Sequence, residues 1–194
     1  MTAIDVARKF VGKRESAGHN RADWIDAINR EVGIPLGSPY CAAGVSHCFH
    51  ECRDQRAFDL ERIERFPRSG GSQAIRASLA AMGRLSFDPQ FLMGMHGAIG
   101  GWTNEDDSRH GHVFLITSRF TSPKGLVEAI GTIEFNTDGS RADRDGDGCY
   151  ELRRVLLANG KFQARDTNTG KLIGAQHVLW FGNTTYMPGG AWWK

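Results

Sequence analysis

The segment Gly37-Ser38-Pro39-Tyr40-Cys41-Ala42-Ala43-Gly44-Val45-Ser46 predicts a helix with a cysteine in its first turn. Pro39 disfavours a helical conformation for the residue before it, so the helix can begin only after this proline. Cys41 then lies among backbone N–H groups that have no partner inside the helix, and the helix dipole stabilises an anion there. Because the thiolate is the nucleophilic form of cysteine, this position favours a reactive Cys41 over a buried structural one.

Two later segments contain the groups that would complete a nucleophilic site. Gly111-His112-Val113 opens an apolar run typical of a buried strand, and Thr132-Ile133-Glu134-Phe135-Asn136 predicts another strand. Glu134 and Asn136 are two residues apart, so we expect both side chains on one side, where either can accept the imidazole N–H of His112. A nucleophile, a base and orienting groups at separate positions are the parts of a cysteine hydrolase. A solvated polar pair is the alternative for Glu134 and Asn136.

Other histidines compete with His112 for the role of general base. His110 would share a face with His112 if the strand began earlier, but Gly111 argues against that extension. The sequence therefore favours His112. We expect the remaining histidines to be surface or core residues: His19, His47, His50, His96 and His177.

These segments, in this order, resemble the CHAP domains, the cysteine, histidine-dependent amidohydrolases and peptidases of bacterial and phage cell-wall enzymes. The similarity covers about residues 10–155 and includes Gly12-Lys13-Arg14-Glu15, Asn20, Gly33, Gly37, Pro39-Tyr40-Cys41-Ala42, Gly111-His112-Val113, Thr132–Thr137 and Asp145-Gly146-Asp147-Gly148. Two positions depart from it: Phe135 stands where such domains often have glycine, and Ala98-Ile99 where they often have Asp-Ile.

The resemblance implies a papain-like fold and a thiol mechanism. In that mechanism Cys41 attacks, His112 moves the proton, Glu134 holds His112 and Asn136 supports it. Backbone N–H groups at the helix start would bind the oxyanion, with Tyr40 lining the site. The implied function is a peptidoglycan hydrolase, either an N-acetylmuramoyl-L-alanine amidase or a peptide-stem endopeptidase, resembling a phage endolysin or a bacterial lytic effector. The alternatives are a catalytically silent wall-binding or phage structural module and an amidase acting on a small peptide-like metabolite.

The order of expected elements predicts an α+β fold, with helices packed on one side of an antiparallel sheet. We expect helices that begin at Thr2, Asn20 and Ser72, with Ile75, Leu79 and Met82 inward on the last, and a cysteine helix over 40–53. The expected strands are 113–117, 126–129 paired with 132–136, 151–157, a hairpin over 161–173, and 178–181. The 194 residues fit a single catalytic domain, 1–194, in which the hairpin, strand and Trp-containing tail of 156–194 follow the similar region.

Composition limits the partners and the location. A net charge of +2 with interleaved signs gives no nucleic-acid footprint. No apolar run reaches the ~20 residues of a membrane span. The first residues lack the pattern of a secretory signal, so we expect synthesis in the cytoplasm and action on the cell wall, in the periplasm or outside the cell. Peptidoglycan is the expected partner of a monomeric protein, and an immunity or export partner stays open.

A thiol mechanism needs no cofactor, because the thiolate is the nucleophile. Asp143-Arg144-Asp145-Gly146-Asp147-Gly148 imitates the opening of a calcium loop, but Arg154 stands where the loop needs a bidentate glutamate. We therefore expect a turn there, with calcium bound in some other way left open. Cys48 and Cys52 lie one helical turn apart and are expected as free, core-facing thiols, since a zinc site lacks companion ligands. The terminal Trp192-Trp193 is expected to dock on the domain or to stack on a sugar.

Overall fold

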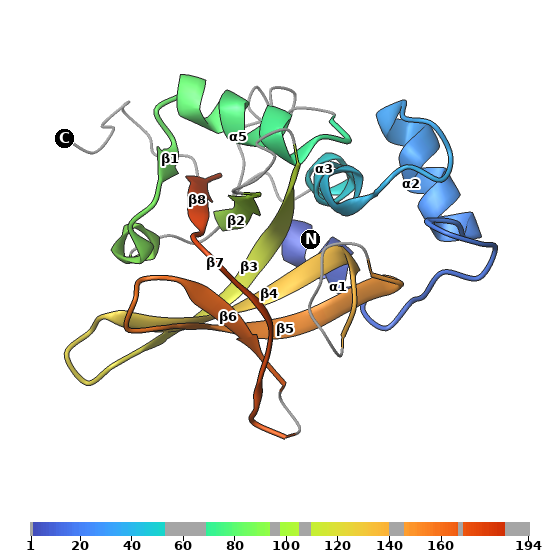
Figure 1. Cartoon of the computed structure of the whole chain (residues 1–194). Coiled ribbons are helices and arrows are strands. Elements are labelled where there is room, and N and C mark those ends of the chain that lie inside the picture. The colour runs from blue at the N-terminus through green and yellow to red at the C-terminus, as the bar shows by residue number, and fades with distance from the viewer. Residues whose placement is uncertain are drawn as a thin grey trace.

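The computed structural model describes residues 2–52, 69–93, 98–104, 110–139, 146–166 and 169–184. Within these ranges, four α-helices lie beside one curled sheet (Figure 1). The helices are α1 (Ala3–Arg8), α2 (Asp23–Val32), α3 (Cys41–Glu51) and α5 (Ser72–Ala81), with a short 3-10 helix, η1 (Pro89–Leu92). The strands are β1 (Leu85–Ser86), β2 (Ala98–Thr103), β3 (Gly111–Thr121), β4 (Val127–Thr137), β5 (Gly148–Leu156), β6 (Phe162–Arg165), β7 (Leu172–His177) and β8 (Trp180–Asn183). All neighbouring strands are antiparallel, in the order β1-β8-β2-β3-β4-β5-β6-β7, so the predicted α+β class is confirmed.

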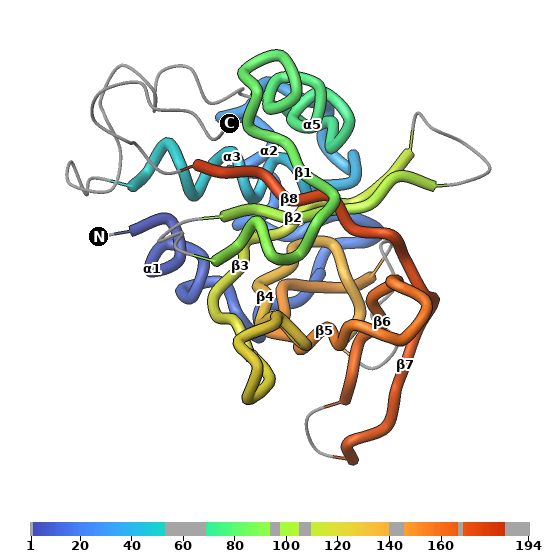
Figure 2. The backbone as a smooth tube through the Cα atoms, turned by 90° about the vertical axis from the view of Figure 1, so that its left-hand side faces the viewer, coloured from blue at the N-terminus to red at the C-terminus, as the bar shows by residue number. Residues whose placement is uncertain are grey.

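The sheet curls until its distant strands meet. β7 lies at one edge and β8 next to the other, yet only residues 178–179 join them (Figure 2). The ring of Phe162 on β6 lies 5.9 Å from that of Phe181 on β8, although four strands separate β6 from β8 in the sheet order. The curl therefore encloses a second apolar interior, apart from the layer under the helices.

Alternating residues of the central strands pack on the two faces of the sheet. Val113, Leu115, Ile133 and Phe135 pack with the buried side chains of all four helices. The alternate residues of the same strands face the inside of the curl, and this interior contains Trp102, Phe114, Ile116, Ile130, Phe162 and Phe181. Each large apolar side chain buried in this way stabilises the fold by roughly 1.5–3 kcal/mol. The predicted packing of helices on one face of the sheet is thus confirmed.

The helix ends differ in one respect from the expectation. α1 begins as predicted, since the Thr2 side chain accepts the N–H of Asp5 in a capping box. α2 begins at Asp23, so the prediction that Asn20 caps it is wrong. Asn20 instead has a positive φ of 55°, donates its N–H to Glu15 Oε2 at 2.8 Å, and donates Nδ2 to the carbonyl of Gly37 at 3.2 Å. Asn20 therefore ties the segment around Glu15 to the loop that leads into Cys41.

The central hairpin also differs. The expected pair of strands, 126–129 and 132–136, is one continuous strand, β4. Gly131 does not turn the chain: it pairs with Ser118 and Arg153, and a Cβ added there would lie 2.3 Å from Ser118 Oγ. The glycine thus permits a close approach of β3 at a bulge. β1, β2 and η1 were not expected, and Met82 is 38% exposed rather than inward.

Candidate active site

Cys41 is the first residue of α3 and faces a groove. Tyr40 precedes the helix without a side-chain cap, so the first amide N–H groups of α3 are left without intrahelical partners. Cys41 is 6% exposed and lines a groove of about 320 Å³. The other lining residues come from the loop before α3, the start of α5 and the start of β3: Ile34, Pro35, Ser38, Pro39, Gly70, Gly71, Ser72, His110 and Gly111. A substrate bound in this groove could therefore reach the thiol.

The sheet opens where α3 meets it. The pairing of β3 with β4 ends at Leu115 and Ile133, whereas β3 continues on β2 and β4 continues on β5. The start of α3 lies at this opening, since the backbone of Val113 hydrogen-bonds to Cys41 and Phe135 packs against Gly44. Cys41 is thereby brought to the same end of the two strands as His112 and Glu134.

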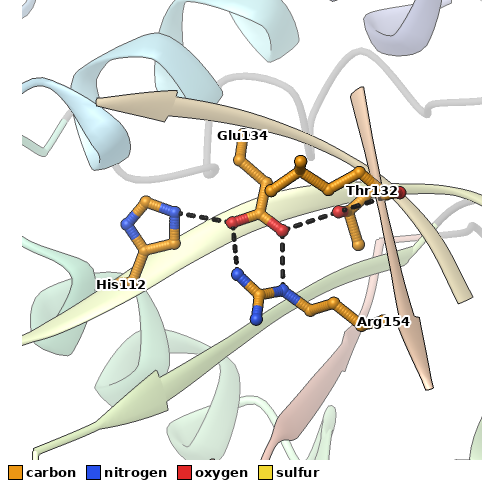
Figure 3. A network of polar contacts seen from close by, with 5 residues as sticks. His112, Thr132, Glu134 and Arg154 are labelled. Atoms are coloured by element: carbon orange, nitrogen blue, oxygen red, sulfur yellow. Dashed lines mark hydrogen bonds and ion pairs between the residues drawn. The ribbon is translucent and has the colours of Figure 1, made fainter. Parts of the chain in front are cut away.

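His112 is fully buried behind Cys41. Its Nε2 lies 3.1 Å from Glu134 Oε2 (Figure 3), and its ring packs on Trp102 at 4.6 Å. An ionised carboxylate can only accept, so Nε2 carries the proton of this bond. Nδ1 then remains for Cys41. Nδ1 of His112 makes no hydrogen bond of normal distance and angle. Cys41 and His112 are nevertheless close enough to shift each other's pKa.

The Cys41–His112 contact favours the charged forms of both side chains. Burial alone would raise the pKa of Cys41, but the neighbouring His112, with the amides of Val113 and Ala42, outweighs it and lowers that pKa. Burial would likewise lower the pKa of His112, but Cys41 and Glu134 outweigh it and raise that pKa. A lowered thiol pKa beside a raised imidazole pKa is the signature of a thiolate–imidazolium pair.

Glu134 is held by three buried side chains (Figure 3). Arg154 donates Nε to Oε1 at 2.7 Å and Nη2 to Oε2 at 2.8 Å, and Thr132 donates Oγ1 to Oε1 at 2.6 Å. Burial opposes ionisation of Glu134, but the charge and hydrogen bonds of Arg154 and His112 hold its pKa well below the usual range. The carboxylate is therefore ionised and fixed in one orientation.

Thr132 and Arg154 were not predicted as site residues. On the inner face of the curl, Thr132 pairs with Leu152 and Ile130 pairs with Arg154, so the arginine runs along the sheet to reach Glu134. The contact depends on the register of β4 with β5, which the sequence does not reveal. In the sequence, Arg154 is noticeable only as a residue unsuited to a calcium loop.

The other two predicted site residues, Asn136 and Tyr40, differ from the expectation in backbone conformation or side-chain direction. Asn136 is buried with a φ of 55°, at a register shift between Phe135 and Thr137, so strand alternation no longer places it on the side of Glu134. Tyr40 is buried, with its hydroxyl 3.5 Å from Glu15 Oε1 and its ring against Trp24, and it is not among the groove-lining residues. The structure thus brings Cys41, His112 and Glu134 together, while the Tyr40 side chain points into the core.

All four cysteines are buried thiols outside any disulfide, as expected for core-facing Cys48 and Cys52. Burial raises the pKa of Cys48 and of Cys149, which separates them from Cys41. Within the described ranges, no group of three or more His, Cys, Asp or Glu side chains is placed to hold a metal ion, and no helix is long and apolar enough to cross a bilayer. Asp143, Asp145, His96 and the Trp192-Trp193 pair lie outside the described residues, so the expectations for them are untested.

Comparison with known proteins adds no assignment. No model of a known protein family matches the chain, and no curated protein matches it.

Proposed function

We propose that the chain is a cysteine amidase or peptidase with a papain-like CHAP fold that cleaves an amide bond in peptidoglycan. One observation carries the proposal: Cys41 lies at a helix start on a groove, beside His112, whose Nε2 is held by the ionised Glu134. The sequence resemblance supplies the substrate class. A binding module has no need of a thiol with a lowered pKa beside a fixed imidazole.

The first half of the reaction would form an acyl-enzyme. The Cys41 thiolate attacks the carbonyl carbon and forms an S–C bond, while the carbonyl electrons move to the oxygen. Backbone N–H groups at the start of α3 stabilise that oxyanion. His112 then donates its Nδ1 proton to the leaving nitrogen, the C–N bond breaks, and a thioester remains.

Water would complete the cycle. His112, now neutral, takes a proton from water at Nδ1, and the resulting hydroxide attacks the thioester carbon. The C–S bond breaks, the free carboxylic acid leaves, and the thiolate–imidazolium pair is restored. Glu134 keeps the other proton on Nε2, so Nδ1 is the atom that exchanges protons. The cycle balances without a cofactor, and we propose that the protein acts as a monomer on the cell wall.

Purified cell walls test the proposal. The wild type is expected to reduce their turbidity, and Cys41→Ala is expected to lose this activity with an unchanged circular dichroism spectrum. Mass spectrometry of the released muropeptides then shows whether the cut separates sugar from peptide or lies within the peptide. Wall binding without cleavage would indicate a silent module. Cleavage of small acyl-peptides alone would indicate an amidase of metabolites.

A further inference from the structure

We propose that Arg154 is a positioning residue that neutralises Glu134, so that the imidazolium of His112 remains free to balance the Cys41 thiolate. This inference deepens the proposed function and rests on it. Arg154 acts through Glu134, to which it donates two hydrogen bonds, and it does not itself line the groove.

The geometry of the contact is that of a closed ion pair. Both nitrogens of one edge of the guanidinium meet both carboxylate oxygens, at 2.7 and 2.8 Å, and the side chains are 1% and 0% exposed. The guanidinium also lies over the ring of Trp102, 4.6 Å from its centroid. Buried bidentate pairing of this kind fixes the orientation of a carboxylate as well as its charge.

Four side chains form a charge row, namely Cys41, His112, Glu134 and Arg154. In the reactive state their charges alternate as thiolate, imidazolium, carboxylate and guanidinium, so the buried row has no net charge. Within it Arg154 is the counter-ion of Glu134, and His112 is the counter-ion of Cys41.

Removing the guanidinium would change which group balances His112. A buried site disfavours a net charge, so one negative group would then have to accompany the imidazolium. A carboxyl is a stronger acid than a thiol, so Glu134 would be the negative group that balances the imidazolium. The proton would then stay on the sulfur of Cys41. Cys41 would become a thiolate only at higher pH, although Arg154 lies at the far end of the row.

Among the residues that the structure describes, three further titratable side chains lie near this row. His110 lines the groove beside Cys41, the charge of Glu134 acts on Cys149 of β5, and His177 of β7 stacks on Trp102 at 4.2 Å. The variants below keep all three, so a difference between those variants reports on the charge row.

The test measures the alkylation of Cys41 by iodoacetamide as a function of pH, with the site resolved by mass spectrometry. The proteins are wild type, Arg154→Met, the double variant Glu134→Gln/Arg154→Met, and Arg153→Met. Arg153 is the matched control, because it is the adjacent arginine of β5 and its guanidinium lies over Phe120 instead. Circular dichroism and thermal unfolding show which variants are folded.

We expect the wild type and Arg153→Met to share a midpoint below that of an ordinary thiol, about pH 8.5. Arg154→Met should move the midpoint up by about one pH unit or more, which lowers alkylation at pH 6 roughly tenfold. The double variant should recover most of the wild-type midpoint, because the amide that replaces the Glu134 carboxylate still accepts from His112 but no longer competes as its counter-ion. A merely structural role of Arg154 would not give this recovery.

The outcomes separate the two proposals. A wild-type midpoint equal to that of a free thiol would overturn the proposed function. A low wild-type midpoint that Arg154→Met leaves unchanged would overturn the role of Arg154 alone. If Arg154→Met does not fold, the double variant decides, since its row has no unpaired buried charge: a midpoint within about one pH unit of the wild type supports the role, and a free-thiol midpoint overturns it.

Discussion

Gly44 of α3 and Phe135 of β4 are in such close contact that a Cβ added to the glycine would lie 2.3 Å from Cγ of the ring. Glycine lowers helix stability by about 1 kcal/mol relative to alanine, so its place inside α3 needs another reason. The aromatic ring is that reason. At this contact the large residue is on the strand and the glycine is on the helix.

Gly44→Ala should therefore destabilise the fold, by about 1–3 kcal/mol, despite the better helix propensity of alanine. Chemical denaturation of Gly44→Ala, Phe135→Leu and the double variant would measure this effect. The smaller side chain of Phe135→Leu should restore much of the stability that Gly44→Ala loses. Strictly additive effects of the two changes would show that the contact is not the cause.

Cys41 should be alkylated faster than the other cysteines near neutral pH. It lines the groove and its pKa is lowered, so its thiolate persists below the pH at which an ordinary thiol ionises, whereas burial raises the pKa of Cys48 and of Cys149. Peptide mapping after brief iodoacetamide treatment measures the order. Cys41→Ser and Cys41→Ala should both abolish wall hydrolysis while the protein stays folded. Preferential labelling of Cys48, Cys52 or Cys149 would contradict the assignment of Cys41.

His112→Ala and His110→Ala should differ in which kinetic constant they change. Loss of the buried His112 removes the base, which lowers kcat by about 10²–10⁴-fold. His110 lines the groove, so its loss should change KM and leave most of kcat. Steady-state kinetics on a soluble muropeptide separate the two, and the reverse pattern would make His110 the base.

Glu134→Gln should lower the apparent pKa of the basic limb of the pH–rate profile. It should also reduce the rate more than Asn136→Ala does. The carboxylate raises the pKa of His112, and an amide cannot replace that charge. A pH–rate series on both variants checks this prediction. A nearly silent Glu134→Gln beside a strongly impaired Asn136→Ala would instead make Asn136 the partner of His112, since an asparagine alone can hold the histidine of a papain-like site.

Glu134→Gln should also destabilise the protein, because it leaves Arg154 as an unpaired buried charge, at a cost of about 3–5 kcal/mol. The lowered folded-state pKa of Glu134 stabilises the wild type above the unfolded-state value of about 4.3, and this contribution is lost as the pH falls through the folded-state value. The difference in unfolding free energy between wild type and variant should therefore be full at pH 7 and shrink below pH 4. Denaturant titrations at both pH values measure it, and a difference that does not change with pH would contradict the ion pair.

Local signals in the sequence are sufficient for part of this site. Pro39 before Cys41 predicts the helix start, and the apolar run after His112 predicts its strand. The sequence does not indicate Arg154, because its contact with Glu134 depends on the β4–β5 register and on the length of an arginine side chain. Gly131 was misleading for a related reason: a glycine that permits close approach looks in sequence like one that turns the chain.

The place of β8 between β1 and β2 has a consequence for how the chain matures. Gly182 of β8 pairs with both Leu85 of β1 and Ile99 of β2. During synthesis, β1 and β2 therefore leave the ribosome with unpaired edges long before β8, which joins them. Pairing across such long sequence separations is slow, and unpaired edges are prone to aggregate in the meantime. The sheet is therefore completed only after β8 emerges, and a chain that ends before Trp180 leaves the β8-facing edge of β2 without its partner strand.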